Sequence, residues 1–351
     1  PGAAPVVAAL AEAVGVRVPE SRLVRVEDTV SAPSGPGRLG YAVSVSTAGR
    51  TTAEVLDSLR EDGGRNFDAR TYLRERLLDT YLGTVDDSPD QWRWTRTGPD
   101  GRWTPEPRDR ERAFAKYDGV LAGLARGTIP AFVNFGEGYQ EQLGVMAYQR
   151  TLDRQLLSLL DWPVWDSVTS EFEAALTDSV IAAAVAQLPP EYLAGGASFL
   201  AAGLRARRVL LPKAAQGLYR LINQEAAFFG TPGADTVTVT RMQDGALELA
   251  FQDGFRRVYA PGESDAVALY LGGGADRINL AGPGRAGPIL DVAWHPGLTL
   301  AGARGSGQRT KVYGGGPRTG GMRLDIVPDT LPVPEVEDLD LTRPPPVPLH
   351  G

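Results

Sequence analysis

Three side chains in the first third of the chain, Asp86, Gln91 and Asp109, are of the types that hold a magnesium ion and act as a base. Asp86 and Gln91 lie in the acidic run of residues 86–92, and Asp109 lies in the charged segment 107–114. Phosphoryl transfer needs one carboxylate near the attacking hydroxyl, together with a carboxylate and an amide oxygen that hold Mg²⁺ on the phosphates. Oxygen ligands suit this hard cation and no soft metal. The alternative interpretation is that these are ordinary solvated residues in polar loops, because Asp favours turns.

The surrounding sequence predicts a helix, a β-hairpin and then the second acidic cluster. Apolar residues between 68 and 82 recur at helical spacing with Arg and Glu on the other face, and Gly83 ends this helix just before Asp86. The segment Gly-Pro-Asp-Gly at 98–101, between two Trp-containing arms, is typical of a hairpin turn. Asp109 follows the second arm. This order of elements is typical of the C-terminal lobe of kinase-like folds.

The rest of the chain predicts an α+β fold. Besides 68–82, helices are expected at 3–14, 51–59, 140–161, 164–187, 190–208 and 211–226. Thr51 or Thr52 is the expected N-cap of helix 51–59. Strands are expected at 16–26 and 39–45. After Gly230 the apolar period changes to two, which predicts strands at 236–240, 247–251, 257–259, 266–271 and 277–280. We therefore expect a mainly helical, kinase-like domain (residues 1–228), a small Gly-rich antiparallel β domain (229–330) and a Pro-rich acidic linker (331–351).

The composition excludes several kinds of partner and site. A net charge of −7, without a Lys/Arg-rich stripe, excludes nucleic acid as the main partner, because nucleic acid binds a basic surface. The chain has no cysteine and only two histidines, His295 and His350, which excludes disulfides, Cys-ligated zinc and multi-His metal centres. No stretch reaches the roughly 18 consecutive apolar residues of a membrane-spanning helix.

Two other motifs have structural interpretations. Residues 272–280 partly fit the calcium-binding β-roll repeat, but a roll needs several stacked copies and only this copy is convincing. We interpret it as a Gly-rich turn between two strands and predict no calcium site. Arg205, Arg207 and Arg208 lie near the end of a predicted helix, where cations complement the helix dipole.

Several segments resemble the periplasmic region of bacterial outer-membrane proteins that carry a C-terminal BamA-type, surface-antigen barrel. These proteins often include a calcineurin-like metallophosphoesterase domain. The matching segments occur in the family's order and cover most of the chain. They span residues 8–15, 69–79, 83–94, 107–114, 176–181, 188–190, 205–208 and 270–277.

The resemblance implies roles for individual residues. In that family the acidic loop resembles G-D-W-D-R-H-E-D-Q-W, which is similar to the D-x-H-x-x-N/Q loops of HipA-like and CotH-like atypical kinases. Asp86 and Gln91 match the Asp and Gln of that loop, and Asp90 matches its second acid. Asp109 matches the metal-binding Asp of a P-R-D-R-D segment.

This chain differs from the family pattern at three positions. Thr84 and Glu111 stand where the family has Asp, and Ser88 stands where it has His. We also expect the N-terminal lobe, with a nucleotide-contacting Lys, to precede Pro1.

Two functions stay open at this point. The first is a periplasmic kinase-like module that uses Mg²⁺ and ATP on an unknown protein or small molecule. In it Asp86 is the base or substrate-orienting acid, Gln91 and Asp109 are metal ligands, and Asp90 and Glu111 are secondary candidates. The second is a non-catalytic binding or scaffold module attached to the outer-membrane barrel. A metal-dependent phosphoesterase ranks last, because two-metal hydrolase centres usually mix His with carboxylates.

Overall fold

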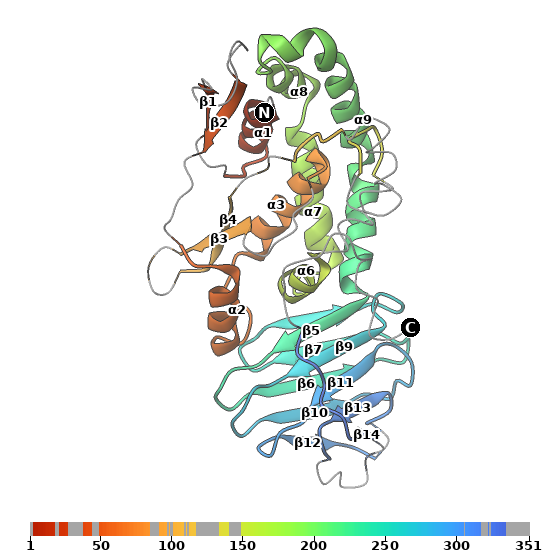
Figure 1. Ribbon diagram of the computed structural model, residues 1–351. Helices are drawn as coiled ribbons and strands as arrows, with labels where there is room; N and C mark the ends of the chain where they lie inside the picture. The colour runs from red at the N-terminus through yellow and green to blue at the C-terminus, as the bar shows by residue number, and fades with distance from the viewer. Residues whose placement is uncertain are drawn as a thin grey trace.

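The computed structural model describes helices above and a β unit below, as seen in Figure 1. The described residues are 3–17, 21–26, 38–43, 49–84, 91–96, 98, 101–108, 110, 112–116, 133–139, 149–304, 306–316, 322 and 324–334. The fold is therefore α+β, as predicted. No described helix is long and apolar enough to cross a membrane.

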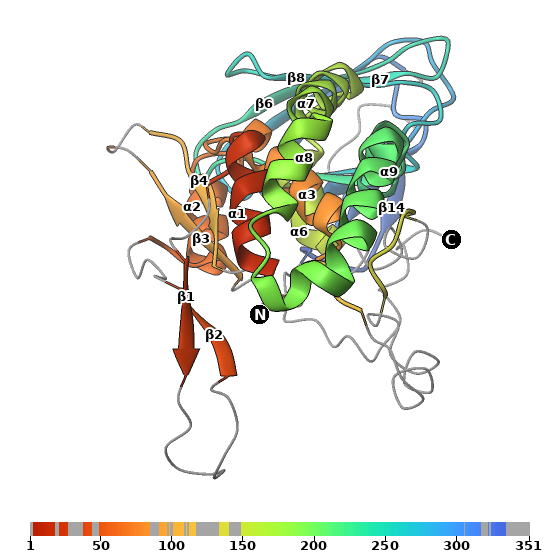
Figure 2. The same cartoon turned by 90° about the horizontal axis from the view of Figure 1, so that it is seen from above.

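The helical body is built around one central helix, α3. Seen from above, α3 lies between α1, α7 and α9 (Figure 2). The helices are α1 (Ala3–Ala13), α2 (Thr52–Glu61), α3 (Ala69–Leu82), α6 (Arg150–Leu157), α7 (Trp162–Ala175), α8 (Asp178–Val185) and α9 (Pro190–Asn223). A hairpin formed by β3 (Trp92–Thr95) and β4 (Thr104–Pro107) packs beside them, and β1 (Ser21–Val26) pairs with β2 (Arg38–Val43).

Local signals placed the first helices correctly. Thr51 is the N-cap of α2 and forms a capping box with Glu54, which satisfies backbone N–H groups at the helix start. The helix α3 ends at Gly83, whose φ of 75° is the left-handed conformation that glycine adopts without strain. Tyr72 of α3 packs against Trp92 and Trp94 with ring centroids 5.3 and 5.7 Å apart, so the hairpin tryptophans belong to the core.

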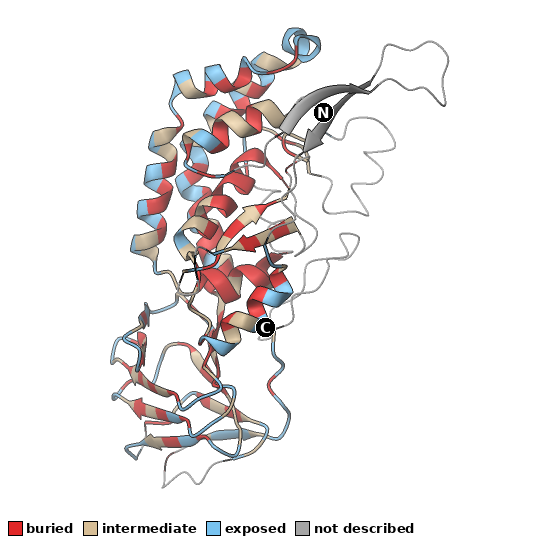
Figure 3. Ribbon diagram, turned by 90° about the vertical axis from the view of Figure 1, so that its left-hand side faces the viewer, coloured by how far each residue is buried: buried red, intermediate tan, exposed pale blue. Residues whose placement is uncertain are grey.

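Two predicted helix boundaries were wrong. The predicted helix 164–187 is split into α7 and α8, because the Thr177 side chain accepts a hydrogen bond from the Val180 N–H and starts a new helix. The predicted helices 190–208 and 211–226 are one helix, α9, which continues through Pro212. A proline inside a helix costs about 3 kcal/mol. Burial of the apolar inner face of α9 on both sides of Pro212 offsets this cost, while its outer face stays exposed (Figure 3).

The β unit consists of two five-stranded sheets, and the predicted antiparallel pairing was wrong for most of it. One sheet has the order β12-β10-β6-β7-β8 and the other β14-β13-β11-β9-β5. Only β6–β7 and β7–β8 pair antiparallel there, and the other neighbours are parallel. The strands are β5 (Glu225–Phe229), β6 (Thr236–Arg241), β7 (Leu247–Phe251), β8 (Arg256–Tyr259), β9 (Ala266–Tyr270), β10 (Arg277–Ala281), β11 (Ile289–Ala293), β12 (Thr299–Gly302), β13 (Thr310–Tyr313) and β14 (Asp325–Val327).

The parallel pairing follows from how the chain coils. From β8 to β13 each turn carries the chain from one sheet to the other, so successive strands such as β9 and β10 lie in different sheets. The hydrogen-bonded neighbour of a strand is then one coil away and runs in the same direction. The residues that face inward from both sheets form one apolar core, which includes Val237, Leu269, Ile278, Leu290 and Val312.

The turns of successive coils also stack on one another. The tripeptide Gly-Ala-Asp occurs at 233–235 and again at 274–276, at the same point of two neighbouring coils. The Asp235 N–H donates to the Asp276 carboxylate at 2.8 Å, and His295 of the next turn lies 2.8 Å from the same carboxylate. Residues 272–276 are therefore a turn between two strands, as predicted, but within a stacked, coiled architecture that was not predicted.

The predicted domain boundaries stay predictions, although two observations bear on their neighbourhood. The strand β5 begins at Glu225, directly after α9, and pairs with β9. The predicted linker starts with residues that pack: Leu331 is buried against Phe229 and Tyr270, and the Pro332 carbonyl accepts a hydrogen bond from the Tyr270 hydroxyl at 2.6 Å. The chain is anchored there because an apolar row on the outer face of this sheet would otherwise face water.

Candidate functional site

Only one of the predicted site residues lies within the described residues. Asp86, Asp90, Asp109 and Glu111 lie outside them. Gln91 is half-buried directly before β3, and its backbone carbonyl accepts a hydrogen bond from the Arg108 N–H at 2.8 Å. This hydrogen bond therefore joins Gln91, a predicted metal ligand, to Arg108, which directly precedes the second predicted ligand, Asp109.

The described neighbours of the predicted site converge on Asp79, near the C-terminal end of α3. The Thr84 N–H and hydroxyl both donate to the Asp79 carbonyl, at 3.0 and 3.3 Å. The Arg110 Nε donates to the Asp79 carboxylate at 2.8 Å. Thr84 lies two residues before Asp86, and Arg110 directly follows Asp109. The structure thus brings Thr84 and Arg110, the described neighbours of the two acidic segments, to the same end of one helix.

A buried charge network surrounds Asp79. Arg76 makes a two-pronged contact with Asp153, with Nε and Nη2 at 2.9 and 3.1 Å from its carboxylate oxygens, and its Nη1 donates to Asp79 at 3.1 Å. The Tyr72 hydroxyl also donates to Asp153. Burial raises the pKa of Asp153, and the Arg76 guanidinium opposes this rise. Two-pronged Arg–carboxylate pairs are strong and geometrically specific, so α6, which carries Asp153, is fixed against α3.

Within the network, the negative charge of ionised Glu75 is stabilised by the fewest hydrogen bonds. Its Oε2 accepts from Arg110 Nη2 at 2.5 Å, but its buried Oε1 has no hydrogen-bond partner within the described part of the chain. Burial raises the pKa of Glu75 to about 7, and the nearby Arg110 only partly opposes this. With Glu75 protonated, the charges of Arg76, Arg110, Asp79 and Asp153 cancel.

The C-terminal carbonyls of α3 are taken up by a second buried arginine. Arg207 of α9 donates to the carbonyls of Thr80 and Tyr81 at 2.5 and 2.8 Å, and also to the carbonyls of Gly136 and Gly138. Its guanidinium lies 4.0 Å from the ring centroid of Tyr139. Arg207 is therefore structural, as expected for this group of arginines. The predicted reason was wrong, because the helix continues well beyond it.

The described residues do not make a metal centre by themselves. No group of three or more His, Asp or Glu side chains is placed to hold a metal ion within the described ranges. Gln91 is the only predicted ligand there, and an amide oxygen alone does not hold Mg²⁺. Among the described residues, the buried Glu75 Oε1 and Arg110 Nη1 have no hydrogen-bond partner, and Arg110 directly follows Asp109.

Sequence reasoning missed the charged residues of α3. It placed the Arg and Glu side chains on the face opposite the apolar residues and predicted no buried charge, whereas Glu75, Arg76 and Asp79 are buried. One signal was available, because apolar and charged residues alternate around α3 without a clean polar face. From Tyr72 to Leu82 every residue of this helix except Arg74 is buried, so its buried charges need internal partners.

Comparisons with known proteins give remote likenesses only. No protein-family model matches the sequence, and no curated protein matches it. The crystal structure of a Helicobacter pylori proinflammatory kinase, CtkA, matches at 13% identity and a TM-score of 0.36, over 62% of this chain and 85% of that chain. A toxin–antitoxin complex of Shewanella oneidensis MR-1, with HipA, HipB and operator DNA, matches at 15% identity and a TM-score of 0.35, over 60% of this chain and 57% of that chain. At these TM-scores the likeness says nothing about activity, and the function rests on the residues of this chain.

Proposed function

We propose that this chain is a kinase-like module that binds a nucleotide with Mg²⁺ where its two acidic segments meet. The observation that supports the proposal is the convergence of Thr84 and Arg110 on Asp79, together with the contact between Gln91 and Arg108. These contacts keep the residues next to Asp86 and Asp109 close to the same helix end. In this proposal Asp86 is the base or substrate-orienting acid, and Gln91 and Asp109 are the metal ligands.

The buried network gives these segments a rigid support. Arg110 is held by two carboxylates, and Asp79 is held in turn by Arg76. A site built on a rigid, well-packed element keeps its geometry better than a site on a free loop. The network would therefore hold the Asp109 segment in position without taking part in any reaction itself.

Replacing Asp109 by alanine tests the proposal. Calorimetric titration of the whole chain with ATP, with and without Mg²⁺, is expected to show Mg²⁺-dependent binding in the wild type. Asp109→Ala should weaken it by about tenfold or more, since removing a charged ligand costs at least about 1.4 kcal/mol. Asp166→Ala, which removes an exposed acid on α7, is the matched control and should leave binding unchanged. Equal Mg-ATP affinity in Asp109→Ala and wild type would refute the proposed site.

A non-catalytic module is the second candidate, and Thr84 favours it. Thr84 stands where the resembling family has an Asp, and here it is buried with its hydroxyl donating to the end of α3. A position that holds an acid in that family has a structural role in this chain. This candidate predicts no Mg²⁺-dependent heat with ATP in the wild type, and a loss of stability alone in Thr84→Ala.

The cellular setting is a separate proposal that rests on the family resemblance. We propose that the module lies in the periplasm and is attached to an outer-membrane barrel in the full-length protein. Protease treatment of cells that produce the full-length protein tests this. The module should be cut after the outer membrane is permeabilised while the inner membrane is intact. Protection under those conditions would contradict the proposed location.

A further inference from the structure

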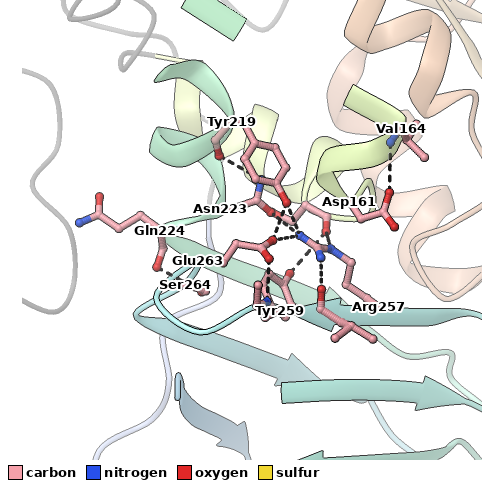
Figure 4. Close-up of polar contacts among 12 residues, drawn as sticks. Asp161, Val164, Tyr219, Asn223, Gln224, Arg257, Tyr259, Glu263 and Ser264 are labelled. Carbon is pink, nitrogen blue, oxygen red and sulfur yellow. Dashed lines mark hydrogen bonds and ion pairs between the residues drawn. The ribbon is translucent and has the colours of Figure 1, made fainter. Parts of the chain in front are cut away.

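A groove of about 540 Å³ lies between the helical body and the β unit. Its walls come from the start of α7, the last turns of α9 and the loop between β8 and β9, residues 260–265. The size lies within the range of small-ligand sites in proteins. Figure 4 shows the polar contacts beneath it, where Glu263 points toward Arg257 and Gln224 extends away from them.

The loop side of the groove is held in place by hydrogen bonds to Glu263. Glu263 accepts from the Tyr219 hydroxyl at 2.5 Å, from the Ala260 N–H at 2.8 Å and from the Arg257 guanidinium. Arg257 also donates to Asn223 at 3.2 Å. Because Arg257 is almost fully buried and paired with Glu263, their charges cancel. The rim is thus preformed, and a ligand would not have to order this loop on binding.

The opposite wall presents polar side chains that are available to a ligand. Gln216 and Arg220 are exposed, and their side chains make no hydrogen bond or ion pair within the described part of the protein. Gln224 donates to Asp265 at 3.2 Å at the edge of the groove. The half-buried indole of Trp162 closes the groove and packs its ring against Tyr219, with centroids 5.2 Å apart.

We infer that this groove binds a neutral, hydroxyl-rich ligand, namely a short oligosaccharide. The lining carries one arginine, Arg220, and two carboxylates, Asp265 and Glu263, and the buried Arg257 pairs with Glu263, so the groove has no net charge that favours an anion or a cation. Amide, guanidinium and carboxylate groups together supply both donors and acceptors, which suits hydroxyls that donate and accept at once. The indole offers an apolar surface for the C–H face of a sugar ring. An apolar ligand would leave these polar groups without partners.

Titration with neutral trisaccharides tests this inference. Maltotriose, cellotriose and tri-N-acetylchitotriose are added to the whole chain, and binding is followed by saturation-transfer NMR and by calorimetry. At least one should bind saturably, and Gln216→Ala and Arg220→Ala should each weaken it by about fivefold or more, a cost of about 1 kcal/mol. Both residues are exposed, so these changes should leave the melting temperature unaltered.

Matched controls and a competitor separate the outcomes. Gln187→Ala and Arg285→Ala remove the same side-chain types from exposed positions outside the groove and should leave saccharide binding unchanged. Trp162→Ala should abolish binding. Failure of all three trisaccharides to bind, or equal binding by the Gln216 and Arg220 variants, would overturn the inference. Displacement of a bound sugar by triglutamate would also overturn it, by showing an anion site.

Discussion

Replacing Glu75 by glutamine tests the buried charge network around α3 most directly. The Glu75 side chain is about 1% exposed, and only one of its oxygens has a hydrogen-bond partner among the described residues. Asp79 differs, because Arg110 binds one of its oxygens and Arg76 binds the other. Ionised Glu75 therefore loses more hydration than its one partner restores, and its pKa rises from its ordinary value of 4.5 to about 7.

The rise in pKa makes stability depend on pH with a definite sign. A folded-state pKa above the unfolded value means that the folded protein binds the proton more tightly. The stability from protonated Glu75 is fully present below pH 4.5 and is lost as the pH rises to about 7. A rise from 4.5 to about 7 corresponds to about 3 kcal/mol. Glutamine has the same shape and no charge, so Glu75→Gln should not lose this stability.

Urea unfolding followed by tryptophan fluorescence measures the effect across this pH range. The free energy of unfolding of Glu75→Gln, minus that of the wild type, should rise by about 3 kcal/mol between pH 4.5 and 7. Glu12 is exposed on α1, so Glu12→Gln is the matched control, and its profile should follow the wild type. Parallel profiles for Glu75→Gln and wild type would show that Glu75 is ionised throughout, and would refute the reasoning.

Three further changes probe other parts of the fold. Arg207→Met removes the donor to four carbonyls, of which those of Thr80 and Tyr81 are buried, and should cost about 3 kcal/mol or more in chemical denaturation. Arg205→Met, at an exposed site, should cost a few tenths of a kcal/mol, and equal losses would contradict the structural role of Arg207. Gly274→Ala places a Cβ 2.4 Å from the backbone oxygen of Gly233, at a φ of 106°, and should cost about 2 kcal/mol or more of stability. In the control, Gly273→Ala, the Cβ meets nothing within 4 Å, and the melting temperature should be nearly unchanged. Thr51→Ala removes the capping box of α2 and should cost about 1 kcal/mol, and an unchanged melting temperature would contradict that role.

The elements that the sequence predicted well are those with local signals. The capping box at Thr51, the glycine after α3 and the hairpin between Trp94 and Trp103 depend on residues within a few positions of each other. Thr177 carried a local signal of the same kind, but it was missed inside a longer apolar pattern. Pro212 carried the opposite signal, and there tertiary packing of α9 outweighed the local preference.

The candidate site was only partly predictable. The sequence pointed to the segments around Asp86 and Asp109, and the described neighbours of those residues do lie together at Asp79. It did not point to Asp79 itself, nor to Asp153, which lies 74 positions away from it and joins the network through Arg76. Spacing along the chain cannot show which distant carboxylate a buried arginine will bind.

The sequence by itself determined the α+β class, the change from helical to period-two patterning near Gly230 and the absence of cysteine chemistry. Only the tertiary structure decided that the strands pair mainly in parallel. Alternation of apolar and polar residues shows which face of a strand is buried, but not the direction of the neighbouring strand. It also decided that Glu75, Arg76 and Asp79 are buried. Helical periodicity shows that one face is charged, but not whether that face is exposed to water or buried with paired charges. Here it is buried, because Asp153 of α6 and Arg110 supply the partners.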